Sequence, residues 1–292
     1  MHVVTLLTSP ARPSLEGALV EALRNAWGGG AARWLAEGEV AEFAMPQEPD
    51  NLWQVWADLQ AQGVDLAVQP KAGRRKRMLI ADMDSTMIEQ ECIDELADMA
   101  GFGAQVAEVT ARAMNGELDF EPALRERVAL LRGLDEAIID QVLEERITLR
   151  AGGREVLATM RAQGAWCVLV SGGFTAFTGR VASMLGFDEE RANRLEVEGG
   201  KLTGRVIEPI VGRAAKLEAL QAISAQRGLG PAQVMAVGDG ANDLAMLRAA
   251  GAGVALHAKP SVAAECRLRV NFGDLTALLY LQGYARDEFV VA

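Results

Sequence analysis

The sequence predicts an α/β protein with a parallel-sheet core, a helical insertion in that core and a small N-terminal α+β domain. Three short apolar runs each end in polar residues, as buried parallel strands do, and they lie at 78–82, 165–173 and 234–240. Between 88 and 150 these strand signals vanish, and Ala, Leu, Glu and Arg recur at helical spacing. The first 70 residues differ in composition from the rest of the chain, because they hold four of the five tryptophans. A separate N-terminal domain is therefore expected.

This N-terminal domain, residues 1–70, is predicted to follow the order β-α-β-α-β. Its strands are expected near 2–7, 39–44 and 64–68, and its helices near 14–26 and 51–61. Residues 71–77 follow, in the stretch PKAGRRKR, and are predicted to be a solvated linker. A nucleic-acid patch is the alternative interpretation of its bases, and the acidic balance of the chain argues against it.

The larger domain is predicted to span 78–292. Besides the three apolar runs, it is expected to contain helices near 173–185, 213–227 and 241–250 and strands near 251–256 and 268–271. The stretch LEVEGGKLTGRV at 195–206 predicts a hairpin around its Gly-Gly turn. Four glycines interrupt the insertion at about 88–150, so we expect it to hold about four helices.

Composition excludes several classes of protein. The chain has 292 residues with 29 Lys and Arg against 40 Asp and Glu, a net charge of −11 that argues against nucleic-acid binding. No apolar run reaches the roughly 18 residues of a membrane span, and the N-terminus lacks the basic start of a secretory signal. The three cysteines form no CxxC pair, which argues against a disulfide scaffold or a zinc finger. We expect a cytoplasmic protein with no nucleic-acid or membrane partner.

Polar clusters follow each of the three predicted core strands. They are DMDST at 82–86, SGG at 171–173 and GDGAND at 238–243. Because ligand sites in open α/β sheets form outside the carboxyl ends of the strands, we expect the three clusters in one crevice. Each cluster alone has an ordinary explanation: an Asp-rich turn, a Gly-Gly turn or a helix cap.

These residue types suggest acid–base, metal and anion chemistry. Asp82 and Asp84 are two residues apart, so one carboxylate can act as nucleophile while the other acts as acid and base. Together with Asp239 and Asp243 they would form a hard oxygen site suited to Mg²⁺. The small hydroxyl and backbone N–H groups at 171–173 suit an anion. A lone lysine such as Lys216 on a helix is usually solvated.

Taken in chain order, these elements resemble the haloacid dehalogenase superfamily of phosphotransferases. The order is DxDST at 82–86, SGG at 171–173, Lys216 and GDGxND at 238–243. Longer stretches, among them DMDSTMIEQECIDELA and VGDGANDLAMLRAAG, resemble the branch that hydrolyses phosphoserine. The resemblance covers about 76–282. It implies a Rossmann-like core with the insertion as a cap, and by analogy an ACT-like N-terminal domain.

The resemblance also implies a reaction, the hydrolysis of phosphoserine, which is the last step of serine biosynthesis. It implies a mechanism for this reaction as well. Asp82 would attack phosphorus and form an aspartyl-phosphate, while Asp84 would protonate the leaving seryl oxygen and then activate water. Mg²⁺ would be held by the side chains of Asp82 and Asp239 and by the backbone carbonyl of Asp84. Lys216 would offset the phosphate charge and help to hold the phosphoryl group.

The remaining implied roles concern substrate binding. The Ser171 hydroxyl and the Gly172 N–H would hold phosphate oxygens, and Asn242 and Asp243 would orient the metal shell and Lys216. In the cap, the resemblance assigns the substrate ammonium to Glu91, the carboxylate to Arg127, and water exclusion to Met114 and Phe120. Without the resemblance, these four residues would be read as solvated helix faces and core.

Two other functions stay open at this point. A related small-molecule phosphatase, or a phosphotransferase that passes the phosphoryl group to another alcohol, would use the same residues. The alternative outside the enzymes is a serine-sensing regulator whose phosphatase half is inert. The intact set of acids argues against it. The expected partner is a small-molecule substrate, and a homodimer formed through the first 70 residues is compatible with the sequence.

Overall fold

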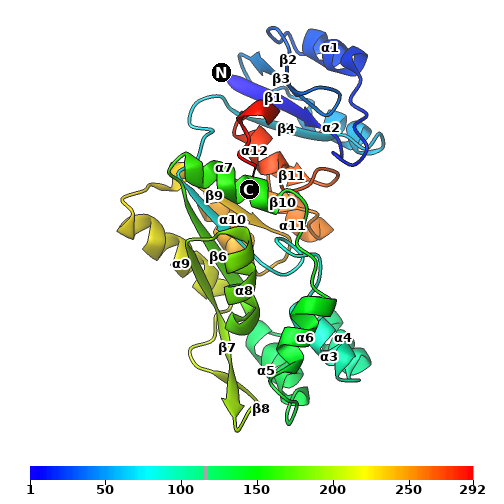
Figure 1. Cartoon of the computed structure of the whole chain (residues 1–292). Coiled ribbons are helices and arrows are strands. Elements are labelled where there is room, and N and C mark those ends of the chain that lie inside the picture. Colours follow the sequence, from blue (N-terminus) through cyan, green and yellow to red (C-terminus); the bar gives the residue numbers. More distant parts are fainter. Residues whose placement is uncertain (115–117, 292) are drawn as a thin grey trace.

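The structure is a computed structural model that describes residues 1–114 and 118–291. It contains a four-stranded sheet and a seven-stranded sheet. Figure 1 shows the smaller sheet at the top, the larger one in the middle and a group of helices at the bottom. The described residues include no helix long and apolar enough to cross a membrane.

The N-terminal domain is built on an antiparallel sheet of order β2-β3-β1-β4. Its elements are β1 (His2–Leu7), α1 (Gly17–Ala26), β2 (Arg33–Ala36), β3 (Val40–Met45), α2 (Leu52–Gln60) and β4 (Asp65–Pro70). The predicted order was wrong by one strand, because β2 is missing from it. A four-residue edge strand is stabilised by its single partner, β3, and four residues are too few for a strand pattern to stand out. The observed β-α-β-β-α-β order is that of a split βαβ unit, and the ACT-like assignment stays a prediction.

The larger sheet has the order β11-β10-β9-β5-β6-β7-β8. Its strands are parallel except β8, which returns antiparallel to β7. They are β5 (Met78–Ala81), β6 (Trp166–Phe174), β7 (Glu189–Glu198), β8 (Lys201–Ile207), β9 (Val234–Gly238), β10 (Ala252–Leu256) and β11 (Leu268–Val270). Every core strand predicted from the sequence is confirmed, and so is the hairpin.

Helices cover both faces of this sheet. One face packs on α7 (Gly153–Ala162), α8 (Thr175–Leu185) and α12 (Ala277–Leu281), and the other on α9 (Arg213–Gln226), α10 (Leu244–Ala249) and α11 (Pro260–Glu265). In β5 the side chains alternate between the two apolar layers, since Leu79 lies in one and Met78 and Ile80 in the other. Burial on both faces explains why this strand is apolar throughout. The helices α7, α11 and α12 lie where the sequence analysis predicts no element.

The insertion forms four helices within the described residues. They are α3 (Cys92–Met99), α4 (Gly103–Met114), α5 (Phe120–Leu130) and α6 (Ile138–Glu145). The β7–β8 hairpin holds them against the core: Gly133 N donates to Leu202 O at 2.8 Å, and Leu202 N donates to Leu134 O at 2.9 Å. Gly204 of the hairpin has φ +78°, and a Cβ there would lie 2.9 Å from Cβ of Arg132. The hairpin therefore packs directly on the cap helices.

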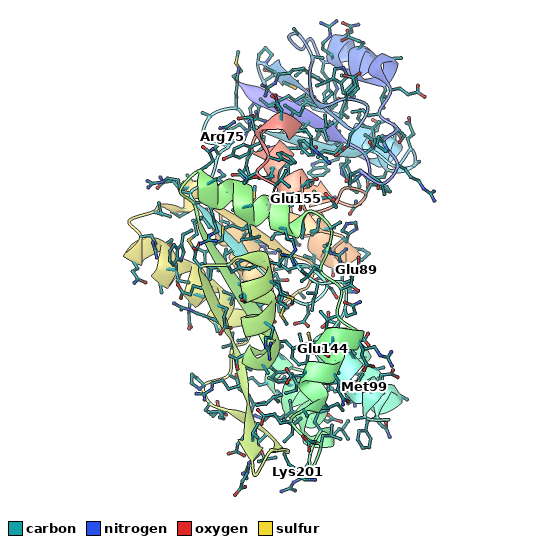
Figure 2. All side chains as sticks on the ribbon, viewed as in Figure 1. Arg75, Glu89, Met99, Glu144, Glu155 and Lys201 are labelled. Atoms are coloured by element: carbon teal, nitrogen blue, oxygen red, sulfur yellow. The ribbon has the colours of Figure 1, made fainter. Side chains whose placement is uncertain are left out.

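The 71–77 segment is mostly exposed, as the sequence analysis predicts, but two of its bases, Arg74 and Lys76, are partly buried. Arg74 pairs with Glu42 of the N-terminal sheet at 2.8 Å, and the two side chains are only 11% and 10% exposed. The ammonium of Lys76 donates to the carbonyls of Gly73 and Ala232 at 2.8 Å each. Through Arg74 the segment contacts the small domain, and through Lys76 it contacts the large one. A run of bases in the sequence does not reveal such tertiary contacts. Side chains from both domains fill the junction (Figure 2).

Candidate active site

The three predicted polar clusters meet at one edge of the large sheet. β5 lies between β9 and β6, so Asp82 after β5 has Asp239 after β9 on one side and the end of β6 on the other. The cluster at 171–173 differs in detail from the prediction, because Ser171 and Gly172 lie within β6 rather than after it. The pairing of β6 with β7 shifts register between Val170 and Phe174, and this irregular stretch carries the cluster.

Lys216 lies at the centre of a buried carboxylate cluster. Its Nζ atom is 2.7 Å from Oδ1 of Asp82 and 2.7 Å from Oδ1 of Asp243, and the side chain is fully buried. Burial alone would lower the pKa of Lys216, but the charges of Asp243 and Asp82 outweigh it and raise the pKa. Lys216 is therefore a charged lysine inside the core, and the solvated alternative is wrong.

Three carboxylates are close enough to share one metal ion. Oxygen atoms of Asp82, Asp239 and Asp243 all lie within 4.8 Å of one another. Burial and the charge of Asp243 raise the pKa of Asp82 well above its usual value and that of Asp239 to about 6. A divalent cation would relieve this repulsion, and hard carboxylate oxygens are the ligands that Mg²⁺ prefers. The donor set thus fits the predicted metal, with Thr86 donating to Oδ1 of Asp239 at 3.2 Å.

The side chain of Asp84 is directed away from this metal cluster. It accepts a hydrogen bond from the Ser171 hydroxyl at 2.9 Å and one from the Cys92 N–H at 2.8 Å. A Cβ at Gly173 would lie 2.8 Å from Oδ2 of Asp84, so a larger residue there would displace this carboxylate. Any contribution of Asp84 to a metal site would therefore come from its backbone carbonyl, and this role stays a prediction.

A cavity of about 500 Å³ opens over these residues and reaches into the cap. Most predicted site residues line it: Asp82, Asp84, Glu91, Phe120, Arg127, Ser171, Gly172, Asp239 and Asn242. Lys216 lies behind Asp82 rather than in the wall. The prediction for Met114 concerns a side chain that lies outside the described part of the chain.

An acid and a base of the cap face this cavity. Glu91 accepts a hydrogen bond from the Ser85 hydroxyl at 2.8 Å, and burial together with Asp84 raises its pKa to about 8. Arg127 is 9% exposed, and its Nε and Nη1 atoms donate to Ala123 O and to the hydroxyl of Thr110 at 3.2 Å each. Burial lowers the pKa of Arg127 below its usual value. Both side chains are built into the cap and do not merely solvate a helix face.

Phe120 closes the cavity against the core. A Cβ at Gly172 would lie 2.9 Å from the Phe120 ring, and a Cβ at Gly212 would lie 3.1 Å from it. The ring therefore touches the backbone of the predicted anion site. This contact joins the first residue of α5 to the end of β6.

Sequence reasoning missed several polar residues of the cavity wall, including Thr110, Arg213, Lys259 and Ser261. The signal for two of them was available: Lys259 and Ser261 follow the predicted strand at 251–256, so they belong to the same sheet edge. The backbone N–H of Lys259 donates to the carbonyl of Asp239 at 3.1 Å. Nothing in the sequence marked Thr110, because its place in the wall depends on how the cap helices pack.

Comparisons with known proteins agree with this geometry. The haloacid dehalogenase-like hydrolase family model matches residues 79–248. A phosphoserine phosphatase of Streptomyces coelicolor is 46% identical over 234 residues, which are 80% of this chain and 57% of that protein. The chain thus spans little more than half the length of this relative.

Two solved structures extend the likeness to nearly the whole chain. A HAD family hydrolase of Salmonella enterica serovar Typhi superposes with a TM-score of 0.86 at 28% identity, covering 99% of this chain and 100% of that one. A probable phosphoserine phosphatase of Vibrio cholerae gives a TM-score of 0.79 at 35% identity, covering 98% and 88%. The family match, the relatives and the buried acid–lysine cluster lead to one conclusion: the chain belongs to the haloacid dehalogenase-like hydrolase family.

Proposed function

We propose that the chain is a Mg²⁺-dependent phosphatase that hydrolyses O-phosphoserine to serine and phosphate through an aspartyl-phosphate. The observation that carries this proposal is one cavity with three charged groups in its wall or just behind it. With Mg²⁺ bound, the buried cluster of Lys216 and three aspartates would suit a phosphate, while Glu91 would suit an ammonium and Arg127 a carboxylate. The name of the Streptomyces relative supports the same substrate.

The contacts of Asp82 suit a nucleophile. The Met83 N–H and Lys216 both donate to Oδ1, at 2.7 Å each, and no hydrogen bond from the described residues reaches Oδ2. Oδ2 is therefore the oxygen that can attack phosphorus in line. Mg²⁺ at Asp82 and Asp239 would supply charge that reduces the repulsion between carboxylate and phosphate dianion.

Asp84 is placed to act as acid and base. Its carboxylate is held from two sides, by the Ser171 hydroxyl and the Cys92 N–H, so the orientation of the group is set before substrate binds. Asp84 would protonate the leaving seryl oxygen and afterwards deprotonate the water that attacks the intermediate. When substrate binds, the Ser171 hydroxyl would turn its proton from Asp84 to a phosphate oxygen, and the Gly172 N–H would contact another. Asn242 lines the same cavity.

The cap would read the amino-acid part of the substrate. Glu91 would bind the ammonium and Arg127 the carboxylate, with the guanidinium offering two parallel donors. Phe120 would exclude water by covering the backbone at Gly172 and Gly212.

The test is phosphate release from L-phosphoserine and from two analogues that each lack one group. O-phosphoethanolamine has no carboxylate, and O-phospholactate has no ammonium. We expect Mg²⁺-dependent release that EDTA abolishes, with kcat/KM for phosphoserine at least about 30-fold above either analogue, since an unpaired buried charge costs about 2–5 kcal/mol. Equal release from all three would refute the roles of Glu91 and Arg127. Transfer of the phosphoryl group to added alcohols in preference to water would identify a phosphotransferase instead.

A further inference from the structure

Arg127 is held by a chain of two hydrogen bonds that crosses the cap. Its Nη1 atom donates to the hydroxyl oxygen of Thr110 at 3.2 Å, and that hydroxyl donates to Oδ1 of Asp94 at 3.1 Å. The three residues come from α5, α4 and α3. A hydroxyl has one proton, and because Thr110 gives it to Asp94, its lone pairs are turned toward the guanidinium. The chain therefore has a defined direction, from Arg127 to Asp94.

The chain lies in a desolvated part of the cap. Arg127 is 9% exposed and Thr110 is 7% exposed. Burial raises the pKa of Asp94, and the Thr110 hydrogen bond and the charge of Arg127 oppose the rise. The charge of Arg127 thus lowers the pKa of Asp94 although the Thr110 hydroxyl lies between the two groups.

The intervening threonine leaves Arg127 free for another anion. No carboxylate among the described residues lies within 4.0 Å of its guanidinium. The bonds from Nε to Ala123 O and from Nη1 to Thr110 fix the plane of the group, and Nη2 makes no hydrogen bond to the described residues. A direct ion pair with Asp94 would hold the arginine equally well but would compete with a substrate carboxylate.

We propose that Thr110 and Asp94 are positioning residues, which hold the guanidinium of Arg127 in the plane that receives the substrate carboxylate. This inference rests on the proposed function. It makes substrate specificity depend on the packing of the cap. The helices α3, α4 and α5 must be in place before Arg127 can bind the substrate carboxylate. Thr110 carries the effect, and Asp94 acts through Thr110.

The experiment compares Thr110→Val, which keeps the shape and removes the hydroxyl, with Thr110→Ser, which restores the hydroxyl. Asp94→Asn keeps an acceptor for the hydroxyl and removes the charge. Thr203→Val is the matched control, because Thr203 also donates to a carboxylate, that of Glu196 at 2.6 Å, on the hairpin strand β8. For each variant, kcat and KM are measured with phosphoserine and with O-phosphoethanolamine.

We expect Thr110→Val to raise KM for phosphoserine about ten-fold or more, as the loss of a hydrogen bond to a charged group does. KM for O-phosphoethanolamine should change less than about two-fold, since that substrate has no carboxylate. Asp94→Asn should lie between Thr110→Val and the wild type, and Thr110→Ser and Thr203→Val should match the wild type. An equal loss on both substrates would show a merely structural role and overturn the inference, and so would an unchanged KM for phosphoserine.

A second measurement needs no substrate, so it separates this inference from the proposed function. Guanidinium ¹⁵N NMR of Arg127 in the free protein should show slow rotation of the Nη1 group in the wild type and in Thr110→Ser, and faster rotation in Thr110→Val. Unchanged rotation in Thr110→Val would refute the positioning role. If rotation changes as expected while the wild type does not prefer phosphoserine, the proposed substrate is wrong and Thr110 still positions Arg127.

Discussion

Replacing Lys216 by methionine should destabilise the protein strongly, because three buried carboxylates would lose their common cation. Asp82, Asp239 and Asp243 have oxygen atoms within 4.8 Å of one another, and two of them lie 2.7 Å from Nζ of Lys216. Removing one partner of a buried ion pair costs about 3–5 kcal/mol. A domain is stable by only about 5–15 kcal/mol, so Lys216→Met should lose a large part of the free energy of unfolding.

The assay is urea denaturation of the metal-free protein in EDTA, at about pH 7.5 and at about pH 5. Burial and Asp243 raise the pKa of Asp82 and Asp239, so these groups take up protons as the pH falls. The charge left uncompensated in Lys216→Met is then smaller, and the loss of stability should shrink at the lower pH. Added Mg²⁺ should restore part of the stability at the higher pH, because the ion replaces the missing positive charge.

The control is Lys201→Met, a change of the same kind at an exposed residue at the tip of the β7–β8 hairpin (Figure 2). It should cost less than about 0.5 kcal/mol, as exposed substitutions usually do. If Lys216→Met costs no more than this control, or if its cost is the same at both pH values, the argument from buried charge is wrong.

Three further predictions concern turnover. Asp82→Asn should abolish phosphate release and leave the circular dichroism spectrum intact, because the amide oxygen is a poor nucleophile; release at even about one per cent of wild type would point to another nucleophile. Burial and Asp84 raise the pKa of Glu91 to about 8, so Glu91 is protonated and neutral below that pH. The ratio of kcat/KM for phosphoserine to that for O-phospholactate should therefore rise with pH up to about 8 and then level off, whereas a flat ratio would contradict a charged contact. Arg127→Ala should lower kcat/KM for phosphoserine about 30-fold or more and leave kcat/KM for an aryl phosphate unchanged. Arg125→Ala, on the exposed side of the same helix, should leave both kcat/KM values unchanged. Equal losses on the two substrates in Arg127→Ala would contradict a role of Arg127 in carboxylate binding.

The large sheet could be predicted because its strands are buried on both faces. Such strands are apolar throughout, as in MLIA at Met78–Ala81, and they stand out from the polar residues that follow them. The rule that parallel strands present their carboxyl ends at one edge then brought Asp82, Ser171 and Asp239 together. The strand β2 escaped the prediction, since it is short and is stabilised by pairing with β3 alone.

The site residues on helices were harder to place. Lys216 and Asp243 are 27 positions apart, and only the packing of α9 against the sheet puts the ammonium 2.7 Å from Oδ1 of Asp243. In isolation, the sequence favours a solvated lysine. The order of motifs raised Lys216 to a candidate, and burial with two carboxylate partners made it the centre of the cluster.

Local pattern alone established which residues follow the core strands, and hence the acids of the site, because strand burial and strand direction are both readable along the chain. The orientation of Asp84, the chain from Arg127 through Thr110 to Asp94 and the fastening of Arg74 to Glu42 were settled by tertiary packing. Each of these contacts joins side chains from different elements. Its existence depends on how far one helix or loop is rotated and shifted against another, and no periodicity within a single segment encodes that.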